Sequence, residues 1–220
     1  YSWETYQHGT QNALFKYTTS PDYDADGYYD GRTQLSASDD AAHAAWGGNW
    51  RMPTREEMSE LKQHCTWIET TLDGAKGYRV KGPNGRSIFL PAAGAIDGQS
   101  AIHTGVGGSY WTSTLNESPN YGAICCDFGS SVGLYYSSRD FGYSVRPVLS
   151  DKAPAEYHSI QFNPNGGSGR MEPLVVEQGF YASLPVCTFT HANSSVSFKE
   201  WNTQAGGEGV TYANTTTIEP

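Results

Sequence analysis

The sequence has few basic residues and no long apolar run. Fourteen Lys and Arg stand against 23 Asp and Glu, which gives a formal net charge of -9 over 220 residues. Proteins that bind nucleic acid neutralise phosphates with clustered positive charge, so we expect no nucleic-acid partner. No run approaches the roughly 20 apolar residues that span a bilayer, so we expect no membrane insertion within this chain.

Cysteine is also scarce, and its spacing argues against common metal sites. The four cysteines are Cys65, Cys125, Cys126 and Cys187, and they form no C-x-x-C pair. Cys125 and Cys126 are adjacent, so on a strand their thiols point to opposite faces and do not chelate one ion. We expect no metal and no cofactor. Reduced, partly buried thiols are the favoured state, and a bridge from Cys65 to one of the adjacent pair is the alternative.

Tyrosine and glycine, by contrast, are abundant. The chain has 15 Tyr and 25 Gly, a composition typical of turn-rich β or α+β proteins that keep amphipathic rings half buried. An acidic stretch lacks the glycine and the final glutamate of an EF-hand loop, so we expect a solvated loop there. Its acidic residues are Asp22, Asp24, Asp26 and Asp30.

Two short stretches carry helix signals. In "SASDDAAHAAWGG", Ser38 is the expected N-cap and Gly47 the expected end of the helix. In "PTREEMSELKQHC", Thr54 is the expected N-cap, and Glu57 three residues later completes a capping box.

Strand signals follow from Trp67 onward. "GYRVKGPNGRSIFLP" predicts a hairpin around a Pro-Asn-Gly turn, and "SYWTSTL", "YGAICCDFG", "VGLYYS" and "YSVRPV" predict a meander of antiparallel strands. The composition changes near Lys152, after which the chain consists of short strand signals and Gly turns. We therefore divide it into two domains, residues 1–151 and 152–220.

Four ordered motifs of the first domain carry a family resemblance. They are "DDAAHAAWGGNWRMPTREEMSEL", "SIFLPAAG", "GGSYWTST" and "GYSVRPV". With them, residues 1–149 resemble the major paralogous domain of Fibrobacter and Bacteroidetes surface proteins. That domain is similar to C-type-lectin-like modules and to the formylglycine-generating-enzyme fold. The resemblance implies an α+β fold: a C-type-lectin-like domain with two short helices and antiparallel strands.

The second domain carries a different resemblance. "FNPNGGSGRM" and "FKEWNTQAGGEGVTY" resemble the Listeria–Bacteroides repeat of internalin B-type surface proteins over about residues 157–218. The resemblance implies a small β-grasp-like module. The repeat normally ends in a strand of the type "LYAQW", so we expect the module here to be truncated or to lack that strand.

Neither resemblance brings recognisable catalytic or calcium-binding residues with it. Formylglycine-generating enzymes use a converging cysteine pair, which the adjacent cysteines of this chain do not imitate. Glu117, Pro119 and Asn120 resemble the Glu-Pro-Asn sugar motif of calcium-dependent lectins, but Ser118 interrupts it. We therefore expect a protein that is not an enzyme.

The late strands predict a binding surface instead. If they alternate, Val132 and Leu134 point inward, Tyr136 is undecided, and other side chains point to solvent beside the loop at 116–121. Tyr, Ser and Asn with an occasional Arg are typical of antibody-like binding surfaces. The alternative is that these tyrosines merely cover the sheet. The candidate ligand-binding residues are Asn116, Ser118, Asn120, Tyr121, Tyr135, Tyr136, Ser137, Arg139 and Tyr143.

Together these patterns indicate a non-catalytic ligand-binding or adhesion protein of a bacterial cell surface. Its expected partner is a host or microbial protein or a glycan. Its expected location is extracellular or on the outer surface, with anchoring through sequence outside this chain. The alternatives are a structural interaction module of a larger surface protein and an oxidase of the formylglycine-generating type.

Overall fold

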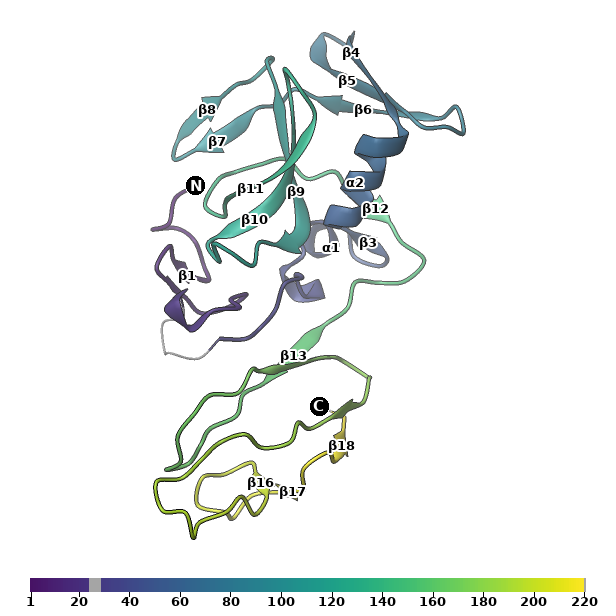
Figure 1. Cartoon of the computed structure of the whole chain (residues 1–220). Coiled ribbons are helices and arrows are strands. Elements are labelled where there is room, and N and C mark those ends of the chain that lie inside the picture. The colour runs from purple at the N-terminus through teal and green to yellow at the C-terminus, as the bar shows by residue number, and fades with distance from the viewer. Residues whose placement is uncertain (24–28, 220) are drawn as a thin grey trace.

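A computed structural model describes residues 1–23 and 29–219 of the chain. The fold consists mostly of small antiparallel sheets with two α-helices, compatible with an α+β or a mainly β class. Figure 1 shows two units, and no strand pairing among the described residues joins them. Neither helix in this part of the chain is long and apolar enough to cross a membrane.

The first helix, α1 (Ala41–Trp46), begins at Asp40 and not at the expected Ser38. The buried Asp40 carboxylate accepts two N–H groups of the first turn, at 2.9 and 3.0 Å. It also accepts the N–H of Met52, a donor far along the chain, at 2.9 Å. Ser38 lies in the preceding 3-10 turn. Gly47 ends the helix as predicted, with a positive φ of 67°.

The second helix, α2 (Arg55–His64), confirms the predicted capping box. The Thr54 hydroxyl accepts the N–H of Glu57 at 3.2 Å, and the Glu57 carboxylate accepts the N–H of Thr54 at 2.8 Å. Arg51 donates to both oxygens of that carboxylate, at 2.7 and 2.6 Å. One carboxylate therefore caps the helix and ties it to the preceding segment. The next residue of α2, Met58, is buried in the core.

The predicted hairpin is confirmed and belongs to a three-stranded sheet of order β4-β5-β6. Its strands are β4 (Thr66–Leu72), β5 (Ala75–Lys81) and β6 (Ser87–Pro91). Gly85 forms the tight turn between β5 and β6 with a φ of 79°. Val80, near the end of β5, buries its side chain and joins the main core of the first unit.

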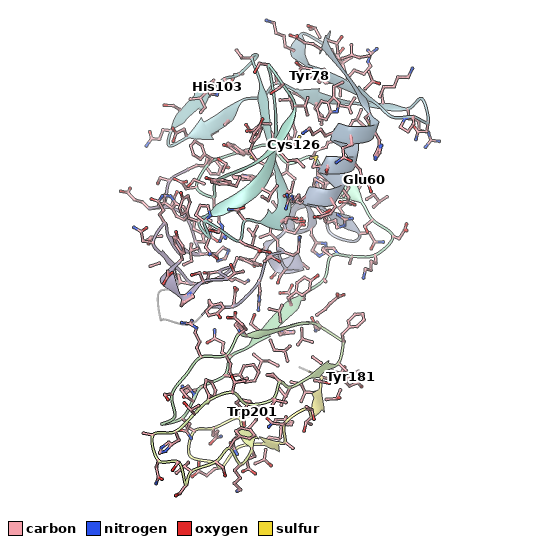
Figure 2. All side chains as sticks on the ribbon, viewed as in Figure 1. Glu60, Tyr78, His103, Cys126, Tyr181 and Trp201 are labelled. Atoms are coloured by element: carbon pink, nitrogen blue, oxygen red, sulfur yellow. The ribbon has the colours of Figure 1, made fainter. Side chains whose placement is uncertain are left out.

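A second antiparallel sheet, of order β11-β10-β9, forms the centre of the first unit (Figure 1). Its strands are β9 (Gly108–Leu115), β10 (Gly122–Phe128) and β11 (Gly133–Ser138). One face of this sheet packs against α2 through the main core. Cys126 lies there, between the sheet and α2 (Figure 2). The core consists of Met58, Val80, Leu90, Ala92, Tyr110, Cys126 and Phe128, with Val132 and Leu134 packed against it as predicted.

The fourth predicted strand, "YSVRPV", forms only in part. Ser144 bridges to Tyr110 beside β9, and the chain then pairs again at β12 (Val148–Leu149), which lies against β3 (Trp50–Arg51). Pro147 lacks the N–H that a continuous ladder requires. The remaining strands of this unit are β1 (Gly9–Thr10), β2 (Ala13–Leu14), β7 (Ala95–Asp97) and β8 (Ser100–Ile102).

The second unit is built from short strand pairs around aromatic rings. The Trp201 ring lies 4.8 Å from both Phe162 and Phe198, measured between ring centroids. These rings border a hollow of about 860 Å³. The strands are β13 (Tyr157–Ile160), β14 (Leu174–Glu177), β15 (Ala182–Ser183), β16 (Trp201–Asn202), β17 (Thr211–Tyr212) and β18 (Thr217–Ile218).

Polar bonds connect the two units at a joint that we define by Asp30, Arg32, Ser38, Glu156 and Ser159. Ser38 donates its N–H and its hydroxyl to the two carboxylate oxygens of Glu156, both at 3.1 Å. The Ser159 hydroxyl donates to the carbonyl of Asp30 at 2.5 Å and accepts from Arg32 Nε at 3.1 Å. The units therefore contact each other directly as well as through the linker.

The expectation of a solvated acidic loop holds only for part of that stretch. Asp22 is exposed, and Asp24 and Asp26 lie outside the described residues. The prediction is wrong for Asp30, which is not solvated as a loop residue would be. Its carboxylate accepts the backbone N–H groups of Tyr17 at 2.7 Å and Thr18 at 2.9 Å. A carboxylate that organises the backbone in this way is a structural residue.

Candidate ligand-binding face

The face of the central sheet that points away from α2 carries a group of aromatic rings. The strand register places Trp111, Cys125 and Tyr135 side by side across β9, β10 and β11. Side chains alternate along each strand, so Tyr110, Cys126 and Leu134 lie on the face toward α2. We call the outward cluster the aromatic face and define it by Trp111, Tyr135, Ser137 and Tyr143.

Tyr143 is held on this face by two contacts. Its ring stacks on Trp111 with a centroid distance of 4.4 Å and an interplanar angle of 27°. Its hydroxyl shares a hydrogen bond of 2.7 Å with the hydroxyl of Ser137 on β11. Burial raises the pKa of the Tyr143 phenol, so the ring stays neutral at ordinary pH. The ring therefore bridges from β9 to β11 in a fixed orientation.

Tyr135 provides the most accessible ring of the aromatic face. A side chain at Gly133 would lie 2.3 to 2.5 Å from the outer atoms of the Tyr135 ring. The ring thus folds back along its own strand and lies over Gly133, with one side against the backbone. The residue is 52% exposed, so the other side of the ring is open to solvent. Glycine is required at position 133 for this close approach.

The sequence does not decide the exposure of Tyr136, which lies on the other face of the sheet. It pairs with Ile124, and its ring and the Asn116 side chain both lie beside Gly122. It is 54% exposed, as accessible as Tyr135, but the two rings are separated by the sheet. Asn116 donates its amide to the Pro119 carbonyl at 3.2 Å. The predicted cluster is therefore divided between two surfaces.

Asn120 was predicted to be a solvent-facing binding residue, and that exposure is wrong. It is 2% exposed. Its side-chain oxygen accepts the N–H of Thr19 at 2.5 Å, and its amide donates to the Glu117 carbonyl at 2.9 Å. The N-terminal segment covers this loop and uses the hydrogen bonds that a ligand would need.

The predicted exposure of Arg139 is wrong for the same reason. Alternation places it on the same side of the sheet as Tyr135, but the N-terminal segment covers that end, and Arg139 is 8% exposed. Nε donates to the Gly122 carbonyl at 3.0 Å and Nη2 to the Tyr17 carbonyl at 2.8 Å. Arg139 therefore joins the segment around Tyr17 to the central sheet.

The other loop residues lie with this covered end. Tyr121 is half buried, and its ring makes an edge contact with Tyr23 at 6.2 Å between centroids. Ser118 is exposed at the tip of the loop, and no contact places it on the aromatic face. Tyr135, Ser137 and Tyr143 are the predicted residues that the fold brings together.

Two residues of this region were missed. Trp111 belongs to the motif "GGSYWTST", which supported only the family resemblance, although alternation relative to Tyr110, which is buried, places it outward. Asp127 also lies on this side of β10, opposite Gly133. Its Oδ1 atom is buried without a hydrogen-bond partner. The sequence "CCDFG" offered no local signal for that environment.

The adjacent cysteines point to opposite faces, as their positions on β10 require. All four cysteines are free, and burial raises the pKa of Cys125 and, to about 11, that of Cys126. Both thiols are therefore protonated at neutral pH and poor nucleophiles. Within residues 1–23 and 29–219, no group of three His, Cys, Asp or Glu side chains is arranged to hold a metal ion.

Comparisons with known proteins identify no relative of this chain. No family model matches the chain, and neither the curated proteins nor the solved structures give a significant match.

Proposed function

We propose that this chain is a non-catalytic ligand-binding or adhesion protein of a bacterial cell surface. In this proposal the first unit is a lectin-like scaffold that presents the aromatic face. The second is a β-grasp-like repeat that acts as a spacer. The partner is a protein or glycan of a host or of another microbe. The observation that carries the proposal is the open Tyr135 ring beside the fixed pair of Trp111 and Tyr143.

Fixed aromatic side chains suit recognition because little conformational entropy is lost when a partner binds. Tyr143 already has its ring stacked and its hydroxyl bonded, and Tyr135 already rests on Gly133. Aromatic residues at the centre of an interface often contribute most of its binding free energy. The aromatic face therefore offers a preformed contact surface.

The alternative is a structural interaction module whose face packs against another domain of a larger surface protein, and the second unit of this chain is not that domain. The joint between the units uses Asp30, Arg32 and Ser38 with Glu156 and Ser159, none of which belongs to the aromatic face. Tyr135 keeps its 52% exposure in the whole described chain. The second unit thus leaves this surface available to an outside partner.

The experiment is an array of glycans and of host and microbial surface proteins, probed with wild type, Tyr135→Ala and Tyr136→Ala. The two variants remove neighbouring tyrosines of nearly equal exposure from opposite faces of one sheet. We expect Tyr135→Ala to weaken binding by at least about tenfold, as expected for a central aromatic contact, and Tyr136→Ala to retain it. Equal binding by all three proteins, or loss only in Tyr136→Ala, would place the ligand elsewhere.

A further inference from the structure

The aromatic face carries a carboxylate whose charge is not compensated by the protein. Asp127 lies directly across from Gly133, over which the Tyr135 ring is placed. Opposite residues on paired strands have Cβ atoms about 5 Å apart, so the carboxylate and the ring are neighbours. Oδ1 is buried without a hydrogen-bond partner. The ion pairs among the described residues use other carboxylates.

The neighbouring groups do not supply a positive charge. The thiol of Cys125 lies beside Asp127, and a thiol is only a weak donor. The charged groups that act on Tyr143 are both acidic, Asp127 and Asp140. Among the basic residues, Lys62 acts on Cys126 and Arg146 acts on Tyr110. Both of those partners lie on the face toward α2, and among the described residues neither cation forms an ion pair with Asp127.

The rings of the aromatic face also favour a cationic ligand. The face of an aromatic ring carries partial negative charge and attracts a cation placed over it. Tyr135 offers such an open ring side next to the Asp127 carboxylate. A bound guanidinium or ammonium group can contact the ring and neutralise the carboxylate at once, whereas a neutral sugar can donate a hydroxyl to the carboxylate but brings no charge. The net charge of -9 also attracts positively charged partners over a longer range.

We infer that the aromatic face binds a cationic side chain, an arginine or lysine, presented by a partner protein. In the bound state the cation lies over the open side of Tyr135 and pairs with Asp127. Tyr143 and Trp111 provide the adjoining apolar surface for the methylene groups of that side chain. This inference rests on the proposed function and names the class of ligand for the same face.

The test is an NMR titration of the isotope-labelled chain with N-acetyl-arginine amide. Asp127→Asn and Tyr135→Leu remove the two proposed contacts. Asp73→Asn removes one charge from the exposed turn between β4 and β5, and Tyr136→Leu removes the tyrosine on the other face. We expect saturable shifts in the amide signals of residues 125–127 and 133–135. Their apparent Kd should rise about fivefold or more in the first two variants and stay constant in the controls.

Several outcomes would overturn the inference. One is an unchanged Kd in Asp127→Asn with an intact amide spectrum, and another is an equal response to N-acetyl-glutamine amide. If Asp127→Asn does not fold, Tyr135→Leu against Tyr136→Leu still decides the result. Shifts at this face with methyl glucoside but not with the arginine amide would reject the cation and keep the proposed binding face. Failure of the proposed function itself would appear in the array experiment instead, as binding that is unchanged by Tyr135→Ala.

Discussion

The ring of Tyr135 occupies the space that a side chain at Gly133 would need, two residues earlier on the same strand. This arrangement fixes the ring over the backbone and opens its other side to solvent. Because the atoms in conflict are at the mobile end of a tyrosine, a methyl group at position 133 would displace the ring and leave the strand in place. A substitution at Gly133 can therefore change the position of the Tyr135 ring with little effect on the stability of the fold.

We expect Gly133→Ala to reduce ligand binding as strongly as Tyr135→Ala, while the free energy of unfolding changes by only about 1 kcal/mol. Chemical denaturation measures the stability, and the Hα signal of Gly133 reports the ring. That signal should be shifted upfield in wild type and in Tyr136→Ala, and should lose the shift in Tyr135→Ala. An unshifted Gly133 signal in wild type would show that the ring does not rest there.

Arg139 should behave as a structural residue and not as a contact residue. Arg139→Ala removes the donor to the Tyr17 carbonyl and leaves the Gly122 carbonyl with the N–H of Asn116, both in a buried setting. We expect the free energy of unfolding to fall by about 3 kcal/mol. The control is Arg79→Ala on the exposed side of β5, which should change it by less than about 0.5 kcal/mol. Urea denaturation of both variants measures the difference, and equal losses would contradict the assignment.

The stability of α2 should depend on pH through Glu57. Hydrogen bonds from Arg51 lower the pKa of the Glu57 carboxyl despite partial burial. A carboxyl with a lowered folded-state pKa stabilises the fold above its unfolded pKa of about 4.3, and the effect is lost as pH falls through the folded pKa. We expect Glu57→Gln to cost about 1 kcal/mol at pH 7 and progressively less as the pH falls below about 4.

Glu60→Gln is the matched control, because Glu60 is exposed on the same helix (Figure 2). Its effect on the free energy of unfolding should be small over the same pH range. Denaturant titrations of the three proteins at several pH values provide the measurement. A Glu57→Gln deficit that stayed constant down to pH 3 would show that the cap is not maintained by charge.

The cysteines should differ sharply in reactivity. Cys125 and Cys126 are 0% and 1% exposed, whereas Cys65 and Cys187 are partly accessible. With a pKa of about 11, the Cys126 thiol is ionised in roughly one molecule in a thousand at pH 8. We expect iodoacetamide to modify Cys65 and Cys187 in the native protein, and the other two only in denaturant. Mass spectrometry of digests measures this, and rapid native labelling of Cys125 would reopen an enzymatic role.

Local signals predicted the local structure well. Thr54 and Glu57 are three residues apart, so the capping box needs no information from the rest of the chain. The hairpin around Gly85 is equally local. The N-cap of α1 was assigned to Ser38 because two good capping residues lie close together. Asp40 is favoured because its carboxylate also accepts from Met52, a contact that only the folded chain creates.

In the candidate site, too, local features were predicted correctly and long-range contacts were not. Alternation along β11 correctly placed Tyr135 and Ser137 on one side of the sheet. It could not reveal that the N-terminal segment covers Arg139, since that depends on a contact across 122 residues. Alternation also puts Tyr136 on the side of Leu134, but it could not reveal that this end of the side is uncovered and leaves Tyr136 54% exposed. Pairing and coverage are long-range properties, and a single sequence carries little information about them.

The joint between the units has a mechanical consequence. Ser38 and Asp30 belong to the first unit, yet they bond to Glu156 and Ser159, which begin the second. A pulling force on the second unit would load several hydrogen bonds of the joint together before the linker could straighten. The joint would then transmit force directly from one unit to the other, which a flexible linker alone would not do.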